Sequence, residues 1–132
     1  MANTFYDFKD LLKAQHPEAV ELPNSVLSLD LGSAPLFFAP APDDPDSLIM
    51  RTRVLKLEDV PRSGDFAKAA LAGNFFWHAT RGATLSIGPD EALYLTERCL
   101  IDEFPDTDAI EASIEEFSMT VTDWQIRRSL YA

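Results

Sequence analysis

The sequence predicts a single small α+β domain, an antiparallel sheet with helices packed on it, in the order α-β-β-β-α-β-β-α. Apolar residues recur at helical spacing near both ends of the chain. Between these ends, several segments alternate apolar and polar residues, as half-buried strands do. Glycine and proline separate the alternating segments. The length of 132 residues suits one domain over 1–132 that buries a sizeable core.

The first helix is expected to begin after Thr4, whose hydroxyl can cap it. Phe5, Phe8 and Leu12 recur at helical spacing, and charged residues fill the other face. Pro17 lies at or just past the end of this helix.

Three strands are expected next, over about 27–31, 36–39 and 48–57. The first alternates leucine with polar residues, and Gly32 and Pro35 end it. A rigid acidic loop of proline and aspartate, over 40–46, separates the second strand from the third. In the third strand, one face is expected to carry Met50, Thr52 and Val54.

A short alanine-rich helix over about 65–72 and a β-hairpin over about 83–96 are expected to follow. Gly73 and Asn74 are predicted to stop the helix, because both tolerate a positive φ. The hairpin strands alternate apolar and polar residues on either side of a turn at 88–91.

The last helix is predicted to begin at Asp106 or Asp108, and Asp108 with Glu111 has the spacing of a capping box. An apolar stripe at steps of four and three identifies the face that packs on the sheet. It consists of Ile110, Ile114, Phe117, Val121 and Trp124.

The composition favours a cytosolic protein that does not bind nucleic acid. The chain has 11 Lys and Arg against 22 Asp and Glu, a net charge of −11, and such a surface repels phosphate backbones. It suits solubility and basic partners. One cysteine excludes an internal disulfide and fits a reducing compartment. The N-terminus lacks the pattern of a secretory signal, and no apolar run is long enough to span a bilayer.

No catalytic constellation is recognisable, so we predict a protein that is not an enzyme and holds no metal or cofactor. His16 and His78 lack the spacing of metal ligands. Cys99 could pair with a distant histidine as a nucleophile, but an unreactive buried thiol is the more common role of a lone cysteine. The aspartates of the loop at 40–46 do not form a calcium loop, because its prolines break the required register.

Aromatic residues are frequent, with nine Phe, two Trp and three Tyr. Phe37-Phe38 and the run 75–77 place aromatics next to each other in sequence. Neighbouring residues of an extended segment point to opposite faces, so both faces need cover. Either the fold supplies apolar contacts on both sides, or one side meets a partner.

The stretch from Leu71 to Trp124 resembles the class I type III secretion chaperones, also called the Tir chaperone family. The resemblance rests on a small-residue helix, Asn74, a loop, the run 82–85, the strand 93–98 and the long helix after it. It implies a small α+β homodimer in the bacterial cytoplasm. Such chaperones bind the unfolded N-terminal segment of a secreted effector and keep it soluble and secretion-competent without ATP.

The resemblance also implies two sets of contact residues. The effector-binding candidates lie on the first helix and the early strands: Phe5, Phe8, Leu12, Leu36, Phe38 and Met50. The dimer-interface candidates lie on the second helix, the loop after it and the hairpin: Ala67, Ala70, Leu71, Phe75, Leu85 and Leu93. The alternative is a related-fold adaptor or regulator that binds a folded partner of the secretion system. A chaperone should expose several spread apolar patches, whereas an adaptor should expose one compact patch.

Overall fold

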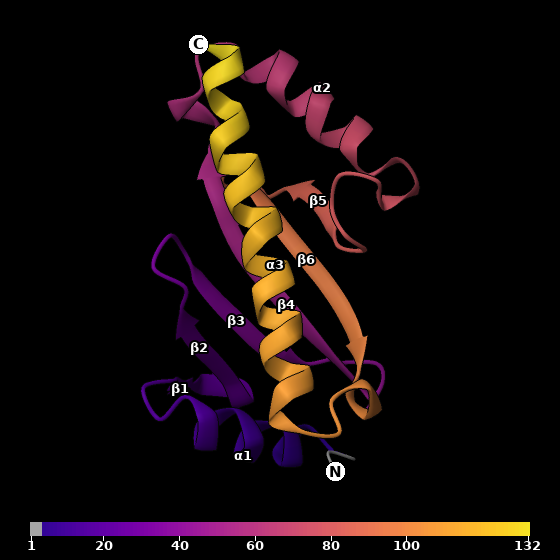
Figure 1. Cartoon of the computed structure of the whole chain (residues 1–132). Helices are drawn as coiled ribbons and strands as arrows, with labels where there is room; N and C mark the ends of the chain where they lie inside the picture. The colour runs from indigo at the N-terminus through magenta and orange to yellow at the C-terminus, as the bar shows by residue number, and fades with distance from the viewer. Residues whose placement is uncertain (1–3) are drawn as a thin grey trace.

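Six strands form one antiparallel sheet in the order β1-β2-β3-β4-β6-β5, in a computed structural model that describes residues 4–132. The strands are β1 (Val20–Leu22), β2 (Val26–Asp30), β3 (Pro35–Pro40), β4 (Ser47–Lys56), β5 (Thr84–Ile87) and β6 (Ala92–Leu100). The helices are α1 (Phe5–Gln15), α2 (Ser63–Gly73) and α3 (Thr107–Arg127). Figure 1 shows α3 lying along the sheet, with α1 at one end of the molecule and α2 at the other end beside β5.

The predicted α+β class is confirmed, and the predicted elements appear in the predicted order. One short strand, β1, was not predicted. All three of its residues are exposed, so it carries no alternation of buried and solvated side chains. It pairs with β2 through the register Val20↔Ser28 and forms one edge of the sheet.

The helix α1 begins where the sequence predicts, at a complete capping box. The Thr4 hydroxyl accepts a hydrogen bond from the Asp7 backbone N–H at 3.2 Å, and the Asp7 carboxylate accepts one from the Thr4 N–H at 3.3 Å. The ring of Phe8 packs 5.5 Å from that of Phe38 and 5.3 Å from that of Phe104. Phe8 therefore ties α1 to the sheet and to the segment before α3.

The sheet buries one face beneath α1 and α3. Met50, Thr52 and Val54 of β4 are buried, as their alternation predicts. Phe38 is also buried, whereas its neighbour Phe37 is half-buried on the opposite face, where it pairs with Arg51. The two adjacent phenylalanines thus serve different faces, and only one of them belongs to the main core.

The end of α2 differs from the prediction of a positive φ at Gly73 or Asn74. Asn74 has a φ of −73°, and the left-handed residues come later, at Phe76 and Trp77 with φ of 50° and 56°. Glycine is required at Gly73 for space, because a Cβ there would lie 2.6 Å from Cζ2 of Trp124. The Asn74 side chain accepts a hydrogen bond from the Leu85 N–H and donates one to the Leu85 carbonyl, both at 2.8 Å. Because β5 is an edge strand, the Asn74 amide makes the two hydrogen bonds that a further strand would otherwise make, and it joins α2 to β5.

The helix α3 begins at Asp106, whose carboxylate accepts a hydrogen bond from the Ala109 N–H at 2.9 Å. Of the two predicted starts, Asp106 is the correct one, and Asp108 lies inside the first turn, where its negative charge suits the helix dipole. The whole predicted stripe from Ile110 to Trp124 is buried. Within residues 4–132, no helix has both the length and the apolar character that crossing a membrane requires.

His16 links the end of α1 to α3 through two carboxylates. Its Nδ1 lies 3.0 Å from Glu18, and its Nε2 contacts Glu111 of α3. Partial burial by itself lowers the pKa of His16, but the hydrogen bonds to Glu18 and Glu111 outweigh it and raise the pKa above the ordinary 6.5. The protonated ring donates to both acids at once, which the neutral ring cannot do.

The interactions of protonated His16 with Glu18 and Glu111 should stabilise the folded protein, and this stabilisation should be lost at alkaline pH. Because the folded-state pKa of His16 is raised, the contribution is complete below 6.5 and is lost as pH rises through the folded-state pKa. The unfolding free energies of wild type and His16→Gln, measured with urea, should therefore differ more at about pH 6 than at about pH 9. A difference in unfolding free energy that stays constant between the two pH values would contradict the assignment.

Candidate binding surfaces

The possible nucleophile is inert in this fold. Cys99 is buried, and its Sγ lies 3.9 Å from Sδ of Met50. Burial, with the nearby negative charges of Glu97 and Glu103, raises the pKa of Cys99 to about 12. The thiol therefore remains protonated at neutral pH and does not act as a nucleophile.

The acidic loop between β3 and β4 has a structural role. Its carboxylates bind the chain itself, since Asp43 lies 2.8 Å from Arg98 and Asp44 accepts a hydrogen bond from the Ser47 hydroxyl at 2.7 Å. Across the part of the chain that the structure describes, no three His, Cys, Asp or Glu side chains are grouped as metal ligands.

The structure brings the six predicted effector-binding residues together, but inside the protomer. All six are buried in the main core cluster, on α1, β3 and β4: Phe5, Phe8, Leu12, Leu36, Phe38 and Met50. A client that leaves this fold intact has little of their surface to contact. Their role in effector binding stays a prediction, and accessible residues near them are better placed for direct contact.

The six predicted dimer-interface residues differ in how far the protomer buries them. Ala70, Leu85 and Leu93 are buried within the protomer, Ala67 is half-buried, and Leu71 and Phe75 are exposed. Only the exposed pair, with part of Ala67, can meet a second subunit directly. Their place in an interface stays a prediction.

Four exposed apolar residues lie at the end of α2 and in the turn after it, and we call this segment the aromatic platform: Leu71, Phe75, Phe76 and Trp77. Leu71 is 65% exposed and Phe76 is 78% exposed. The Phe75 and Phe76 rings pack edge to face at 4.7 Å. A positive φ is uncommon for bulky residues, yet the fold holds two of these residues in that conformation. The consecutive aromatics at 75–77 were the sequence signal for this surface.

A second accessible apolar surface lies at the opposite end of the molecule, on α1 and the edge strand β1. Tyr6 of α1 and Val20 of β1 are more than half exposed, and Leu22 is also exposed. Because β1 is the outermost strand, the backbone groups on its free side have no partner strand among residues 4–132. This edge was not predicted, because β1 has no sequence pattern of its own.

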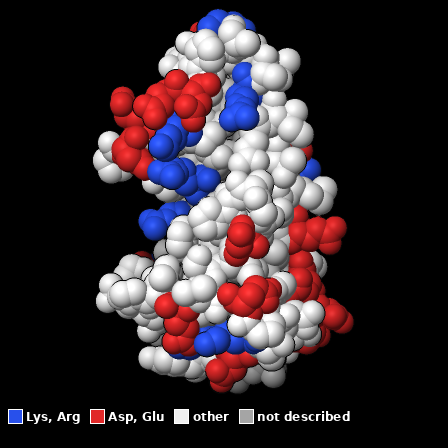
Figure 2. All heavy atoms as spheres, turned by 90° about the vertical axis from the view of Figure 1, so that its left-hand side faces the viewer, with Lys and Arg blue, Asp and Glu red and all other residues white. Residues whose placement is uncertain are grey.

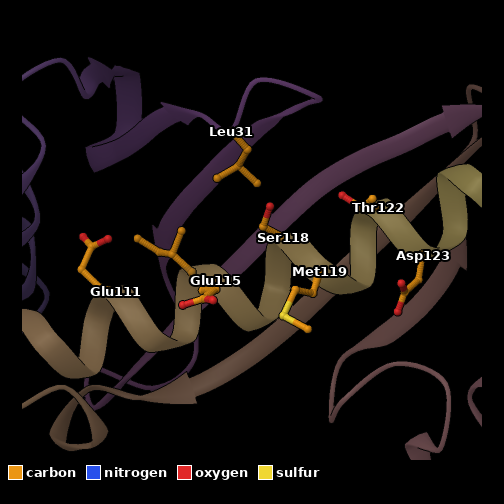
Figure 3. Close-up of a pocket in the computed structure, with 8 residues that line it drawn as sticks. Leu31, Glu111, Glu115, Ser118, Met119, Thr122 and Asp123 are labelled. Carbon is orange, nitrogen blue, oxygen red and sulfur yellow. The ribbon is translucent and has the colours of Figure 1, made fainter.

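A third surface is a groove along α3 with a volume of about 430 Å³. Figure 3 shows its residues on α3, with Leu31 facing them from the segment after β2. Leu31, Ile114 and Met119 supply the apolar lining, while acidic residues lie along it. No sequence pattern predicted this groove, because it forms where Leu31, far from α3 in the sequence, lies against the helix.

Charge is unevenly distributed over the surface. Arg51, Arg53 and Arg98 share the face of the sheet opposite α3, where Arg51 lies 5.9 Å from the centre of the Tyr94 ring. Arg53 lies 3.8 Å from Asp90. Figure 2 shows basic side chains gathered beside a hollow at one edge of the molecule, with acidic side chains above and below them. The side of α3 that bears the groove is acidic.

Comparisons with known proteins agree on one fold. A family model described as the Tir chaperone protein (CesT) family matches residues 15–125. The ExsC–ExsE complex has a TM-score of 0.70 at 17% identity, with 95% of each chain covered. The HopA1–SchA chaperone–effector complex has a TM-score of 0.69 at 12% identity, with 89% of this chain and 92% of that chain covered. The ExoU–SpcU complex from the type III secretion system of Pseudomonas aeruginosa has a TM-score of 0.60 at 15% identity, with 88% and 93% covered. A search of curated proteins finds no match.

Proposed function

The chain belongs to the Tir chaperone protein (CesT) family, and on that premise we propose that it binds the unfolded N-terminal segment of a type III secreted effector. Binding keeps the segment soluble and competent for secretion in the bacterial cytoplasm. It requires no ATP, because the chaperone binds and releases its client without a chemical step.

The observation that carries this proposal is the spread of accessible apolar surfaces over the protomer. The aromatic platform and the α1–β1 edge lie at opposite ends of the molecule, and the α3 groove is a third site. A folded partner would need one compact patch, whereas an extended client can contact separate patches in turn. The solved structures with this fold include a chaperone–effector complex and a complex from a type III secretion system.

The binding energy has two sources in this fold. Burial of apolar client side chains contributes roughly 25 cal/mol for each Å² removed from water. The free edge of β1 can add hydrogen bonds to an extended client backbone. The excess of acidic residues keeps a protein with exposed apolar patches soluble and attracts basic stretches of a client.

The proposal includes a homodimer formed through the aromatic platform. Leu71 and three aromatic side chains project from one end of the protomer, where water would otherwise cover them. The amide of Asn74 fixes the start of this segment to β5, so the platform is held ready for a partner surface. A two-fold interface would pair the platform with its copy and would leave the α1–β1 edges at the far ends of the dimer.

Isothermal titration with N-terminal fragments of candidate secreted effectors tests the function. A true client fragment should bind with a negative change in heat capacity and should gain order in its NMR spectrum, because binding buries apolar surface and folds a disordered chain. A scrambled fragment of the same composition is the control. Binding to a folded domain, with no heat from any leader fragment, would favour the adaptor alternative instead.

A further inference from the structure

The groove on α3 follows two neighbouring rows of side chains, and the members of each row are four residues apart in the sequence. One row is Glu111, Glu115, Met119 and Asp123, and the other is Ile114, Ser118 and Thr122. Residues at this spacing align along one face of a helix and form parallel ridges. The second row ends in two short hydroxyl side chains, so a channel remains open beside the first row, as Figure 3 shows.

The lining of the channel is apolar at its base. Ile114 is almost fully buried beneath it, Leu31 closes one side, and Met119 is half exposed on the other. The thioether side chain of Met119 is flexible, so it can adapt to partner side chains of different shape. The channel therefore suits large aliphatic side chains of more than one kind.

The charge along the channel is negative. Glu111 contacts His16, and Asp123 forms an ion pair with Arg81 at 2.8 Å. Among residues 4–132, no basic side chain pairs with Glu115. Its carboxylate stands beside Met119 and is free to meet a cation from a partner.

We infer that this groove receives a helical segment of the client that carries aliphatic residues four apart and Lys or Arg beside them. The inference rests on the proposed function and names the chemistry of one of its contact sites. A helix fits because its own row of side chains can lie in the channel beside the first row, with the two helix axes crossing at about −50°. An extended segment gains less here, because the backbone of α3 is already hydrogen-bonded internally and offers no strand edge.

Two synthetic helical peptides of equal length and identical leucine positions provide the probes. One carries lysine beside the leucines, and the other carries glutamate in place of lysine. The basic peptide should bind at least about tenfold more tightly, and its affinity should fall as salt is added. NMR shift changes on the wild-type protein should centre on Leu31, Ser118 and Met119.

Two variants test the site without relying on the same physical effect. Ser118→Trp fills the channel without a change of charge, and Ser118→Ala is its control. Glu115→Lys reverses the unpaired charge. Its control is Glu116→Lys, which makes the same charge change on the neighbouring residue outside the groove. Ser118→Trp and Glu115→Lys should each weaken basic-peptide binding by about tenfold or more, and the controls should not.

Equal binding of the two peptides, or NMR shift changes centred away from the groove, would overturn the inference, and the NMR result does not depend on any variant folding. The proposed function is tested separately with leader fragments. If wild type and Ser118→Trp bind a leader fragment equally well, the groove assignment fails while the chaperone function stands. If no leader fragment binds the wild type, the proposed function itself fails.

Discussion

Replacing Trp124 by alanine should lower the free energy of unfolding by about 3–5 kcal/mol, as expected for an aromatic side chain removed from a core. Trp124 is 1% exposed and packs edge to face with Phe66 at 6.0 Å between ring centres. Its Nε1–H donates to the Ala79 carbonyl at 3.0 Å, and its ring occupies the space that a side chain at Gly73 would need. The truncation would leave a cavity and an unpaired carbonyl at the junction of α2 and α3.

Chemical denaturation monitored by circular dichroism measures this loss. Tyr6→Ala is the control, because it removes an aromatic side chain from a position that is 65% exposed and lies outside the aromatic platform. The control should change the unfolding free energy by less than about 1 kcal/mol. Equal losses from the two variants would mean that the junction does not depend on Trp124.

Leu71→Arg should raise the dissociation constant of the proposed homodimer by about 100-fold or more. An arginine in the centre of an apolar interface would have to lose water without gaining a partner, which costs roughly 3–5 kcal/mol. Leu71 is the appropriate position because its side chain is exposed in the protomer, so the monomer fold should tolerate the change. The neighbouring Ala70 is buried, and a charge there would disturb the protomer itself.

Sedimentation equilibrium over a range of concentrations measures the effect. Leu100→Arg is the control, with the same substitution at an exposed leucine on β6. The wild type and the control should show twice the 14.7 kDa monomer mass, and Leu71→Arg should shift toward the monomer. A wild-type mass that stays at the monomer value at all concentrations would refute the dimer.

The sequence predicted the elements whose signals are local. The cap at Thr4 and the apolar stripe of α3 each locate a helix within a few residues, and alternation located β2, β4 and the hairpin. The strand β1 was missed because three exposed residues have no pattern, and only their pairing with β2 defines the strand. The role of Gly73 depends on Trp124, about fifty residues away, so no local rule could supply it.

Burial was harder to predict than secondary structure. Phe8, Phe38 and Met50 were expected to meet a client, yet their apolar character is used within the protomer. A sequence shows that a residue needs apolar contacts, but it does not show whether they come from the same chain or from a partner. The consecutive aromatics at 75–77 were a better indication of an accessible surface, because all three side chains are exposed in the protomer.

The buried thiol of Cys99 makes the chain convenient for attaching probes. With its pKa raised to about 12 by burial, the thiol stays almost entirely protonated at pH 8. Since the chain has no other cysteine, a new cysteine at an exposed site would react with maleimide or nitroxide reagents almost alone. Pairs of spin labels on two copies, or one label on the chaperone and one on a leader fragment, would then report distances in solution without prior removal of a native cysteine.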